Sequence, residues 1–263
     1  MPQRELEGVR LGDLYAALFV PSSLSGGLFN PSKIALSIRR ILIDSILPMT
    51  ASPAPKPFFL SFEGSEGSGK STQIDLLAAR IKAAGHEVVV TREPGGTEIG
   101  EEIRHLLKHA QSGQAMCPET ELLLFAASRA QLVREVIAPA LHENKIVLCD
   151  RFLDSTTVYQ GVARKLSADP VAMINRFAVD VVLPNLTVVL DMPADIGLAR
   201  ARKRTGEQPD RMEQESLDFY QRVREGYLAL AKSAPKRFLV VDGSLPSANI
   251  TDIIWNEFLR RHG

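Results

Sequence analysis

Cysteine is scarce in this chain, which has only Cys117 and Cys149 among its 263 residues. The two lie far apart and fit no metal-ligand spacing, so the sequence indicates neither a structural zinc site nor a disulfide framework. A reducing, cytoplasmic location is therefore expected. Cys149 lies inside an apolar run, and we expect it to be a small buried hydrophobe.

An excess of one charge is also missing. The chain has 31 basic and 31 acidic residues, whereas general nucleic-acid binders usually carry a basic excess. We therefore expect no nucleic-acid partner, although a small phosphate-bearing substrate would need only a few local arginines. No apolar run reaches the roughly 18 residues of a transmembrane helix, so no membrane partner is expected either.

Histidines are few and scattered, and no Ser/His/Asp or Cys/His arrangement for nucleophilic catalysis is recognisable. We expect all five to lie on the surface: His86, His105, His109, His142 and His262.

The chain does contain a phosphate-binding loop after an apolar, aromatic run, residues 58–63, that reads as a buried strand. The next residues fit the pattern Gly, four residues, Gly-Lys-Ser. Its glycines would let backbone N–H groups surround a polyphosphate, Lys70 would reach the β/γ oxygens, and Ser71 would ligate Mg²⁺. A helix from Thr72 would direct its positive end at the same phosphates. The predicted ATP-binding residues are Gly64, Ser65, Glu66, Gly67, Ser68, Gly69, Lys70 and Ser71.

The flanking strand and helix disfavour the alternative of a chance match in a Gly/Ser-rich turn.

A proline-rich linker at residues 49–57 separates this loop from the preceding segment. We expect residues 1–56 to be a poorly ordered extension with linker, and 57–263 to be the phosphate-loop domain. A targeting presequence, a membrane-surface helix at 34–47 and a start codon misplaced upstream of Met49 are the other interpretations. Acidic residues in the extension count against the presequence.

Apolar strands alternate with helices throughout the second part, which predicts an α/β fold. Strands are expected at 58–63, 87–91, 145–150, 186–191 and 237–242. Helices are expected at 98–109, 118–141, 170–180, 194–203, 213–232 and 246–261. This pattern predicts a P-loop NTPase fold, with a five-stranded parallel sheet flanked by helices on both faces.

The active site should lie at the carboxyl ends of these strands. The third strand ends in Asp150 and Arg151. Asp150 suits a Mg²⁺-associated carboxylate, or it caps the next turn, while Arg151 suits a phosphate oxygen. The second strand runs into a Pro-Gly-Gly turn at residues 94–96, which could also be a plain connector.

The motifs FEGSEGSGKSTQ, TREPGGTEIGEEIR, LLLFAASRAQLV, DRFLDSTTVYQG and DRMEQES together resemble the thymidylate kinases, particularly the bacterial ones. The resemblance runs from about Phe58 to the C-terminus and does not cover residues 1 to about 56. It implies a fold of the nucleoside monophosphate kinase type, ATP and dTMP as substrates, Mg²⁺ as cofactor, and a homodimer.

The resemblance also implies residue roles in an acceptor pocket. Phe125 would stack on the thymine ring, and Arg129, one helical turn further on, would bind a thymine carbonyl. Arg104 and Arg151 would hold the acceptor phosphate. Without the resemblance, Phe125 would be read as core packing and Arg104 as a solvated helix charge.

Further residues of the same motifs would complete this pocket. The resemblance places Arg92, Glu93, Thr156, Tyr159 and Gln160 along it. Tyr159 against the 2′ carbon would disfavour ribose, which we state as a hypothesis.

A cationic segment at about residues 200–212 is interpreted as a lid that closes over ATP; a solvated helix end is the alternative. The phosphate loop carries Glu66 and no arginine. In the family, this form takes its catalytic arginine from the lid, which makes Arg202 and Arg204 the candidates beside Lys70, Asp150 and Arg151. Glu66 would contact the acceptor's sugar hydroxyl.

Two other functions remain open at this stage. One is a kinase of the same fold acting on another nucleotide or deoxynucleoside. The other is a P-loop ATPase switch, which would lack a second set of phosphate-binding arginines.

Overall fold

The computed structural model describes residues 56–109, 116–204, 211 and 214–263. All of them fall in the second of the two units into which the chain divides, Ala54–Gly263. The predictions made for residues 1–55, and those for lid residues 205–210, 212 and 213, lie outside the described residues.

Five parallel strands form one sheet in the order β2-β3-β1-β4-β5. The strands are β1 Phe58–Glu63, β2 Val88–Arg92, β3 Ile146–Asp150, β4 Leu186–Asp191 and β5 Phe238–Asp242. Each predicted strand is present, with ends that differ by at most one residue from the prediction. The predicted α/β class and parallel sheet are therefore confirmed.

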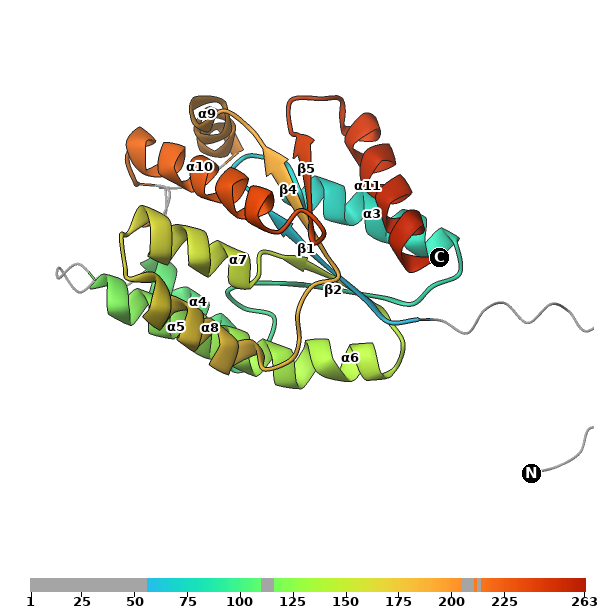
Figure 1. Ribbon diagram of the computed structural model, residues 1–263, viewed down its shortest axis with the longest axis horizontal. Coiled ribbons are helices and arrows are strands. Elements are labelled where there is room, and N and C mark those ends of the chain that lie inside the picture. Colours follow the sequence, from blue (N-terminus) through green and yellow to red (C-terminus); the bar gives the residue numbers. More distant parts are fainter. Residues whose placement is uncertain (1–55, 110–115, 205–210, 212–213) are drawn as a thin grey trace, which may run out of the picture. The chain divides into compact units, whose positions relative to one another are not determined.

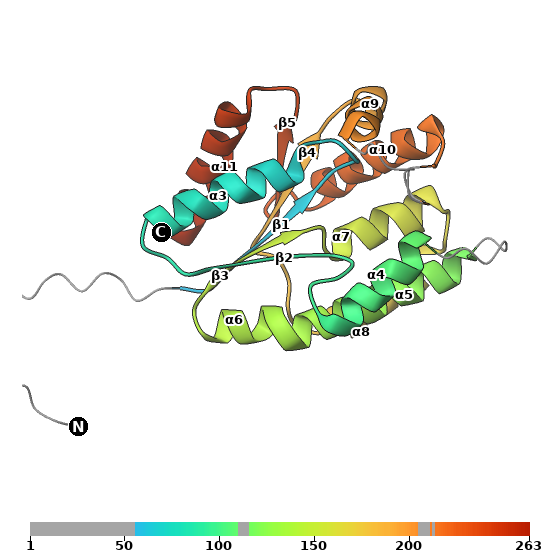
Figure 2. The same cartoon turned by 180° about the vertical axis from the view of Figure 1, so that it is seen from behind.

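Helices cover both faces of this sheet (Figures 1 and 2). The helices are α3 Lys70–Ala83, α4 Glu98–His109, α5 Pro118–Leu132, α6 Ala138–His142, α7 Leu153–Thr156, α8 Ala168–Val179, α9 Ala194–Arg204, α10 Leu217–Ser233 and α11 Ser247–His262. Two π-helical segments join them, η1 Val133–Ile137 and η2 Thr157–Ala163.

The side chains of β1 alternate between the two faces, as expected for a strand. Phe58, Leu60 and Phe62 pack with apolar residues of α3 and α11 in one core cluster. Phe59 points the other way, into a cluster built from η1, α6 and β3. Cys149 belongs to that second cluster and is fully buried, as predicted.

The single helix expected at 118–141 is wrong in one respect, because α5 and α6 are separated by η1. Pro139 lies in the first turn of α6. It has no N–H to donate, and its ring collides with the carbonyl four residues earlier in an α-helix. A wider π turn before the proline relieves that collision.

Two smaller expectations are also corrected. The helix expected from residue 213 begins at Leu217, because the Ser216 hydroxyl caps it by accepting a hydrogen bond from Phe219 N at 3.2 Å. His86 and His262, expected on the surface, are half-buried with ring centroids 5.1 Å apart.

The strand register positions the site. Asp150 stands beside Phe62 of β1 on one side and Arg92 of β2 on the other. Arg151 N then donates to Phe62 O at 2.9 Å, which holds the chain after β3 against the start of the phosphate loop. The carboxyl ends of three strands thus meet where the ligand crevice of such sheets is found.

Candidate active site

The phosphate loop runs from the end of β1 to the start of α3, as the motif predicts. Lys70 is buried at the first position of α3, and its Nζ donates to Gly64 O at 3.2 Å and Ser65 O at 3.0 Å. Burial lowers the pKa of Lys70, and the charge of Arg151 lowers it further. The loop thus holds a cation against its own carbonyl groups, ready to meet a polyphosphate.

Two oxygen ligands stand together at the mouth of this loop. The Ser71 hydroxyl donates to Asp150 Oδ2 at 3.1 Å. Among the described residues, no group of three or more His, Cys, Asp or Glu side chains could hold a metal ion alone. Mg²⁺ commonly binds through one or two protein oxygens, with phosphate oxygens and water completing its octahedron. The Ser71–Asp150 pair fits that mode of binding.

A cavity of about 290 Å³ opens beside the loop. Its wall carries five cationic side chains and three acidic ones: Lys70, Arg92, Arg104, Lys108 and Arg151, with Glu66, Glu93 and Asp150. The wall also includes Phe125, Thr156, Tyr159 and Gln160. Most predicted acceptor residues therefore surround one cavity, and Lys108 joins them although the sequence analysis did not select it.

Arg151 contacts both the phosphate loop and an aromatic ring of the cavity wall. Its φ of 69° places it in the left-handed region, which non-glycine residues seldom adopt. The guanidinium donates to Gly64 O at 2.9 Å and Glu66 Oε1 at 2.6 Å, and it lies 5.0 Å from the centre of the Tyr159 ring. Arg151 therefore ties the phosphate loop to the acceptor cavity.

Glu66 and Glu63 differ in ionisation although both are buried. Burial raises the pKa of Glu66, but the charges of Arg151 and Lys70 outweigh it and lower that pKa to about 2. For Glu63, burial together with the charge of Asp154 outweighs the Ser155 hydrogen bond and the charge of Arg151, and raises the pKa to about 7.

Glu63 was not selected from the sequence. Its carboxylate accepts hydrogen bonds from Phe152 N at 2.8 Å, Ser155 Oγ at 2.6 Å and the Tyr227 hydroxyl at 2.8 Å. The bonds from Phe152 and Ser155 fasten the segment after β3 to the end of β1, and the bond from Tyr227 joins α10 to the same carboxylate. Its position directly before the first loop glycine was the only available signal.

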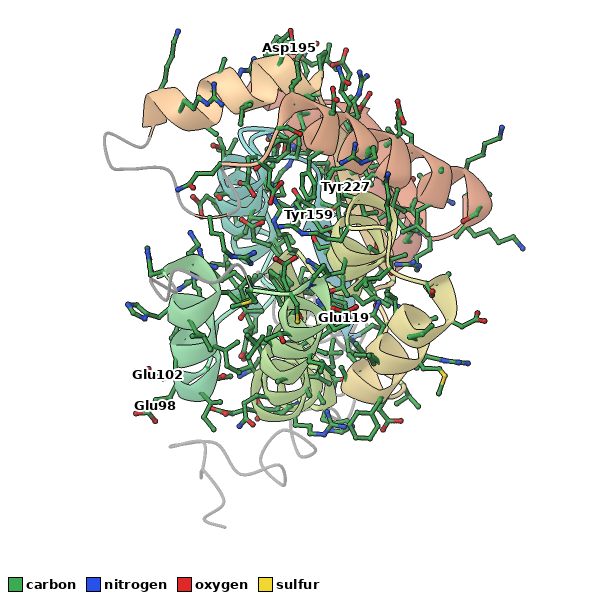
Figure 3. All side chains as sticks on the ribbon, turned by 90° about the vertical axis from the view of Figure 1, so that its left-hand side faces the viewer. Glu98, Glu102, Glu119, Tyr159, Asp195 and Tyr227 are labelled. Atoms are coloured by element: carbon green, nitrogen blue, oxygen red, sulfur yellow. The ribbon has the colours of Figure 1, made fainter. Side chains whose placement is uncertain are left out.

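Arg104 and Arg92 also line the cavity, and each is held by a different neighbour. Arg104 Nη1 donates to Pro94 O at 2.8 Å, so this helix charge points toward the cavity. Arg92 is half-exposed and forms an ion pair with Glu101 at 2.8 Å. Both line the cavity, whereas Glu98 and Glu102 lie on the outer side of α4 (Figure 3).

Phe125 and Arg129 share a face of α5, as predicted, but lie in different environments. Phe125 is half-buried in the cavity wall. Arg129 is fully buried behind it. Its Nε donates to Glu93 Oε2 at 2.8 Å, and its Nη2 lies 2.7 Å from the same oxygen. It also donates to Asn175 Oδ1 at 2.9 Å and Thr156 Oγ1 at 2.8 Å.

Glu93 completes this buried pair with one oxygen to spare. Burial raises its pKa to about 7, although Arg129 opposes the shift. Its Oε1 atom is buried and has no hydrogen-bond partner among the described residues. Because Glu93 also lines the cavity, that oxygen is a polar group available to a ligand.

The remaining acceptor residues come from α7 and η2, which follow β3. Tyr159 and Tyr227 lie near each other in the interior, with ring centroids 6.4 Å apart (Figure 3). Gln160 donates to Glu121 Oε1 at 2.7 Å, which orients its amide. Glu121 is a buried carboxylate that also binds Arg164 and Arg211, and the sequence analysis missed it because those partners are distant in the chain.

The lid candidates are only partly described. Arg202 is exposed on α9, and the side chain of Arg204 lies outside the described part of the structure. Neither is among the cavity's described lining residues. Arg211 lies at the other end of the segment, where its Nη1 is 2.6 Å from Glu121 Oε2 and its Nε donates to Leu107 O at 3.0 Å.

Comparisons with known proteins agree with this geometry. The family model for thymidylate kinase matches residues 62–254. A thymidylate kinase of Kosmotoga olearia is 51% identical over 201 residues, covering 76% of this chain and 95% of that protein. A thymidylate kinase of Geobacter sulfurreducens is 50% identical over 212 residues, covering 78% of this chain and 99% of that protein. The crystal structure of an Ehrlichia chaffeensis thymidylate kinase superposes with a TM-score of 0.61 at 33% identity, covering 78% and 99%.

Proposed function

The chain belongs to the thymidylate kinase family and phosphorylates dTMP to dTDP, and we propose that the cavity beside the phosphate loop holds dTMP while the loop holds ATP with Mg²⁺. The observation that carries this proposal is the position of Arg151. Its guanidinium touches Gly64 and Glu66 of the phosphate loop, and Arg151 itself lines the cavity. An acceptor phosphate bound there would lie next to the β/γ phosphates at Lys70, as transfer requires.

We assign the residues of the donor side as follows. The N–H groups of the loop and the Lys70 ammonium bind the β/γ oxygens of ATP. Ser71 and Asp150 would hold Mg²⁺, directly or through water, and the ion would offset phosphate charge when bound. The acceptor is already a phosphate anion, so positioning and charge neutralisation supply most of the catalysis without a strong base.

On the acceptor side, Arg104 and Arg151 bind the phosphate and Phe125 stacks on the thymine ring. Arg92, Thr156 and Gln160 border the nucleotide. Four protein groups already accept from the Arg129 guanidinium: Glu93, Asn175, Thr156 and, at 3.4 Å, the Phe152 carbonyl. We therefore propose that Arg129 contacts a thymine carbonyl through the N–H that those partners leave over.

The sugar is assigned to Glu66 and Tyr159. The low pKa of Glu66 keeps it an acceptor at neutral pH, which suits a contact with the 3′ hydroxyl. The buried Tyr159 ring would stand against the 2′ carbon and disfavour ribose.

The catalytic cation is assigned to the lid. Charge spreads over the oxygens of the transferring phosphoryl group in the transition state, and arginine matches it well. Because the phosphate loop has no arginine, Arg202 or Arg204 is the proposed source. Closure of the segment would also exclude water and so suppress ATP hydrolysis.

We further propose that the protein is a homodimer in the cytoplasm. On α8, Met173 and Phe177 are 62% and 82% exposed and lie four residues apart, and Val181, just after the helix, is 84% exposed. An apolar stripe of this kind marks an interaction surface. No helix of the described chain is long and apolar enough to cross a bilayer.

A coupled assay over several acceptors tests the proposed substrate preference. With ATP and Mg²⁺, we expect dTDP to form far faster from dTMP than any diphosphate from UMP or CMP. Equal efficiency on UMP or CMP would favour a kinase of another acceptor. Absence of diphosphate product from folded protein would favour an ATPase switch. Full-length protein and a chain starting at Met49 should be compared in the same assay, because equal activity would make residues 1–48 dispensable.

A further inference from the structure

Helix α9 approaches the phosphate loop more closely than side chains would permit. Gly197 is buried in the first half of α9. A Cβ atom built on it would lie 2.6 Å from Glu66 O and 3.2 Å from Ser65 Oγ. From the other side, a Cβ built on Gly67 would lie 2.1 Å from Gly197 O. A glycine of the loop and a glycine of the helix therefore bring two backbones into direct contact.

The contact imposes a glycine at position 197 for steric reasons alone. Gly197 has helical geometry with no positive φ, and alanine is a better helix former than glycine by about 1 kcal/mol. The atom that a methyl group would meet is a main-chain carbonyl, which cannot rotate away as a flexible side chain can. The helix or the loop would have to move.

The residue met by Gly197 is the one that organises the acceptor side. The Glu66 carbonyl faces Gly197, while the Glu66 carboxylate is 2.6 Å from Arg151 Nη2. Arg151 in turn lines the cavity and lies over Tyr159. A displacement of the Glu66 main chain would thus carry the Glu66–Arg151 pair with it. The loop carbonyls that hold Lys70 belong to Ser65 and Gly64, one and two residues before Glu66.

We propose that Gly197 is a positioning residue, which seats α9 against the Glu66 carbonyl and thereby fixes the Glu66–Arg151 pair for the acceptor phosphate. The contact couples the acceptor cavity to α9, whose last turn carries Arg202 and Arg204. No described residue of α9 lines the cavity, so a helix outside the acceptor site controls its geometry. This inference rests on the proposed assignment of Glu66 and Arg151 to dTMP.

The first test is Gly197→Ala, with Gly161→Ala as the matched control. Gly161 is also helical, and a Cβ there meets only Val171 Cγ1 at 3.8 Å, an ordinary contact. We expect Gly197→Ala to lower kcat/KM for dTMP by about 10- to 100-fold, because displaced reacting groups cost that much. The Gly161→Ala control should match the wild type.

A double-mutant cycle with Glu66→Gln separates positioning from a loss of stability. If Gly197 acts through Glu66, adding Gly197→Ala to the Glu66→Gln variant should lower kcat/KM for dTMP by only a small further factor. Full additivity would overturn the proposal, as would kcat/KM within about twofold of the wild type in a folded Gly197→Ala chain. A lower urea midpoint with normal activity would also overturn it.

Amide hydrogen exchange of the wild-type protein gives a second test, which does not depend on the variant's folding. Binding of dTMP alone should slow exchange in residues 197–201 of α9, and Glu66→Gln should abolish that effect. Unchanged exchange in α9 on dTMP binding would overturn the coupling. Failure of the proposed function would look different, because the wild type would then bind no dTMP at all.

Discussion

The buried carboxylates around the cavity contribute to stability with opposite dependence on pH. The pKa of Glu66 is about 2, so its contribution is present above its ordinary pKa of 4.5 and is lost as the pH falls toward 2. The pKa of Glu63 is about 7, so the folded chain keeps a proton that the unfolded chain has lost. The contribution of Glu63 to the free energy of unfolding therefore falls as the pH rises from about 4.5 to about 7.

A Glu63→Gln variant isolates the pH-dependent contribution of Glu63 to the free energy of unfolding. The amide keeps the shape of the side chain but carries no charge at any pH. Relative to the wild type, the variant should gain about 3 kcal/mol of unfolding free energy between pH 5 and pH 8, from 1.36 kcal/mol per pKa unit. Urea unfolding at the two pH values measures this change. A pH-independent difference between variant and wild type would contradict the high pKa of Glu63.

Tyr159 carries the prediction on sugar specificity. A smaller side chain at this position opens space beside the 2′ carbon. We expect Tyr159→Ala to raise the ratio of kcat/KM for ribothymidine monophosphate over dTMP by about tenfold, within the range that steric discrimination in a pocket provides. Steady-state assays of both acceptors check it. If the ratio is unchanged, Tyr159 does not exclude ribose.

At the scale of elements, α5 places the Arg129 guanidinium in the interior beside the buried Glu93 carboxylate. Arg129 neutralises Glu93 in a buried pair, and both side chains are less than 3% exposed, at 1% and 2%. Removing one partner leaves the other charge without compensation. The pair therefore helps to fix α5 against the turn after β2, whatever its contact with the base.

Replacing Arg129 by Met tests that role. We expect a loss of about 3–5 kcal/mol of unfolding free energy at pH 8, because Glu93 is then buried and unpaired. The double variant Glu93→Gln/Arg129→Met should recover part of that loss, since no buried charge remains. Chemical denaturation of both variants measures the difference. Equal stability of the two variants would show that Glu93 is not charged in the folded chain.

The elements also show how far the sequence predicts the structure. Residues 186–191 were predicted correctly because apolar, β-branched runs between turns identify buried strands. The π segment η1 escaped prediction because apolar periodicity persists through Pro139. Glu121, Glu63 and the partners of Arg129 were missed for another reason, because their contacts join segments tens of residues apart and leave no local pattern.

At the scale of the whole molecule, the apolar stripe around Phe177 is exposed in the described part of a single chain. We expect light scattering to give about twice the chain mass of 28.9 kDa. Phe177→Asp should give the mass of one chain, because a charge in an apolar interface is costly to bury. Leu259→Asp, on the exposed side of α11 with 47% exposure, is the control and should leave the mass unchanged. A wild type with the mass of one chain would contradict the dimer.

Two neighbouring anion sites are proposed at the carboxyl end of the sheet, and calorimetric titration of dTMP and ATP tests this arrangement most directly. Arg151→Ala should weaken dTMP binding by about 100-fold, since it removes a charge-assisted contact, and leave ATP within about threefold. Lys70→Ala should weaken the binding of ATP and leave the Kd of dTMP within about threefold of the wild type. Arg80→Ala, which removes a surface ion pair with Asp252, should change neither. If Arg151→Ala weakened the binding of ATP and not that of dTMP, the acceptor phosphate would not lie at Arg151.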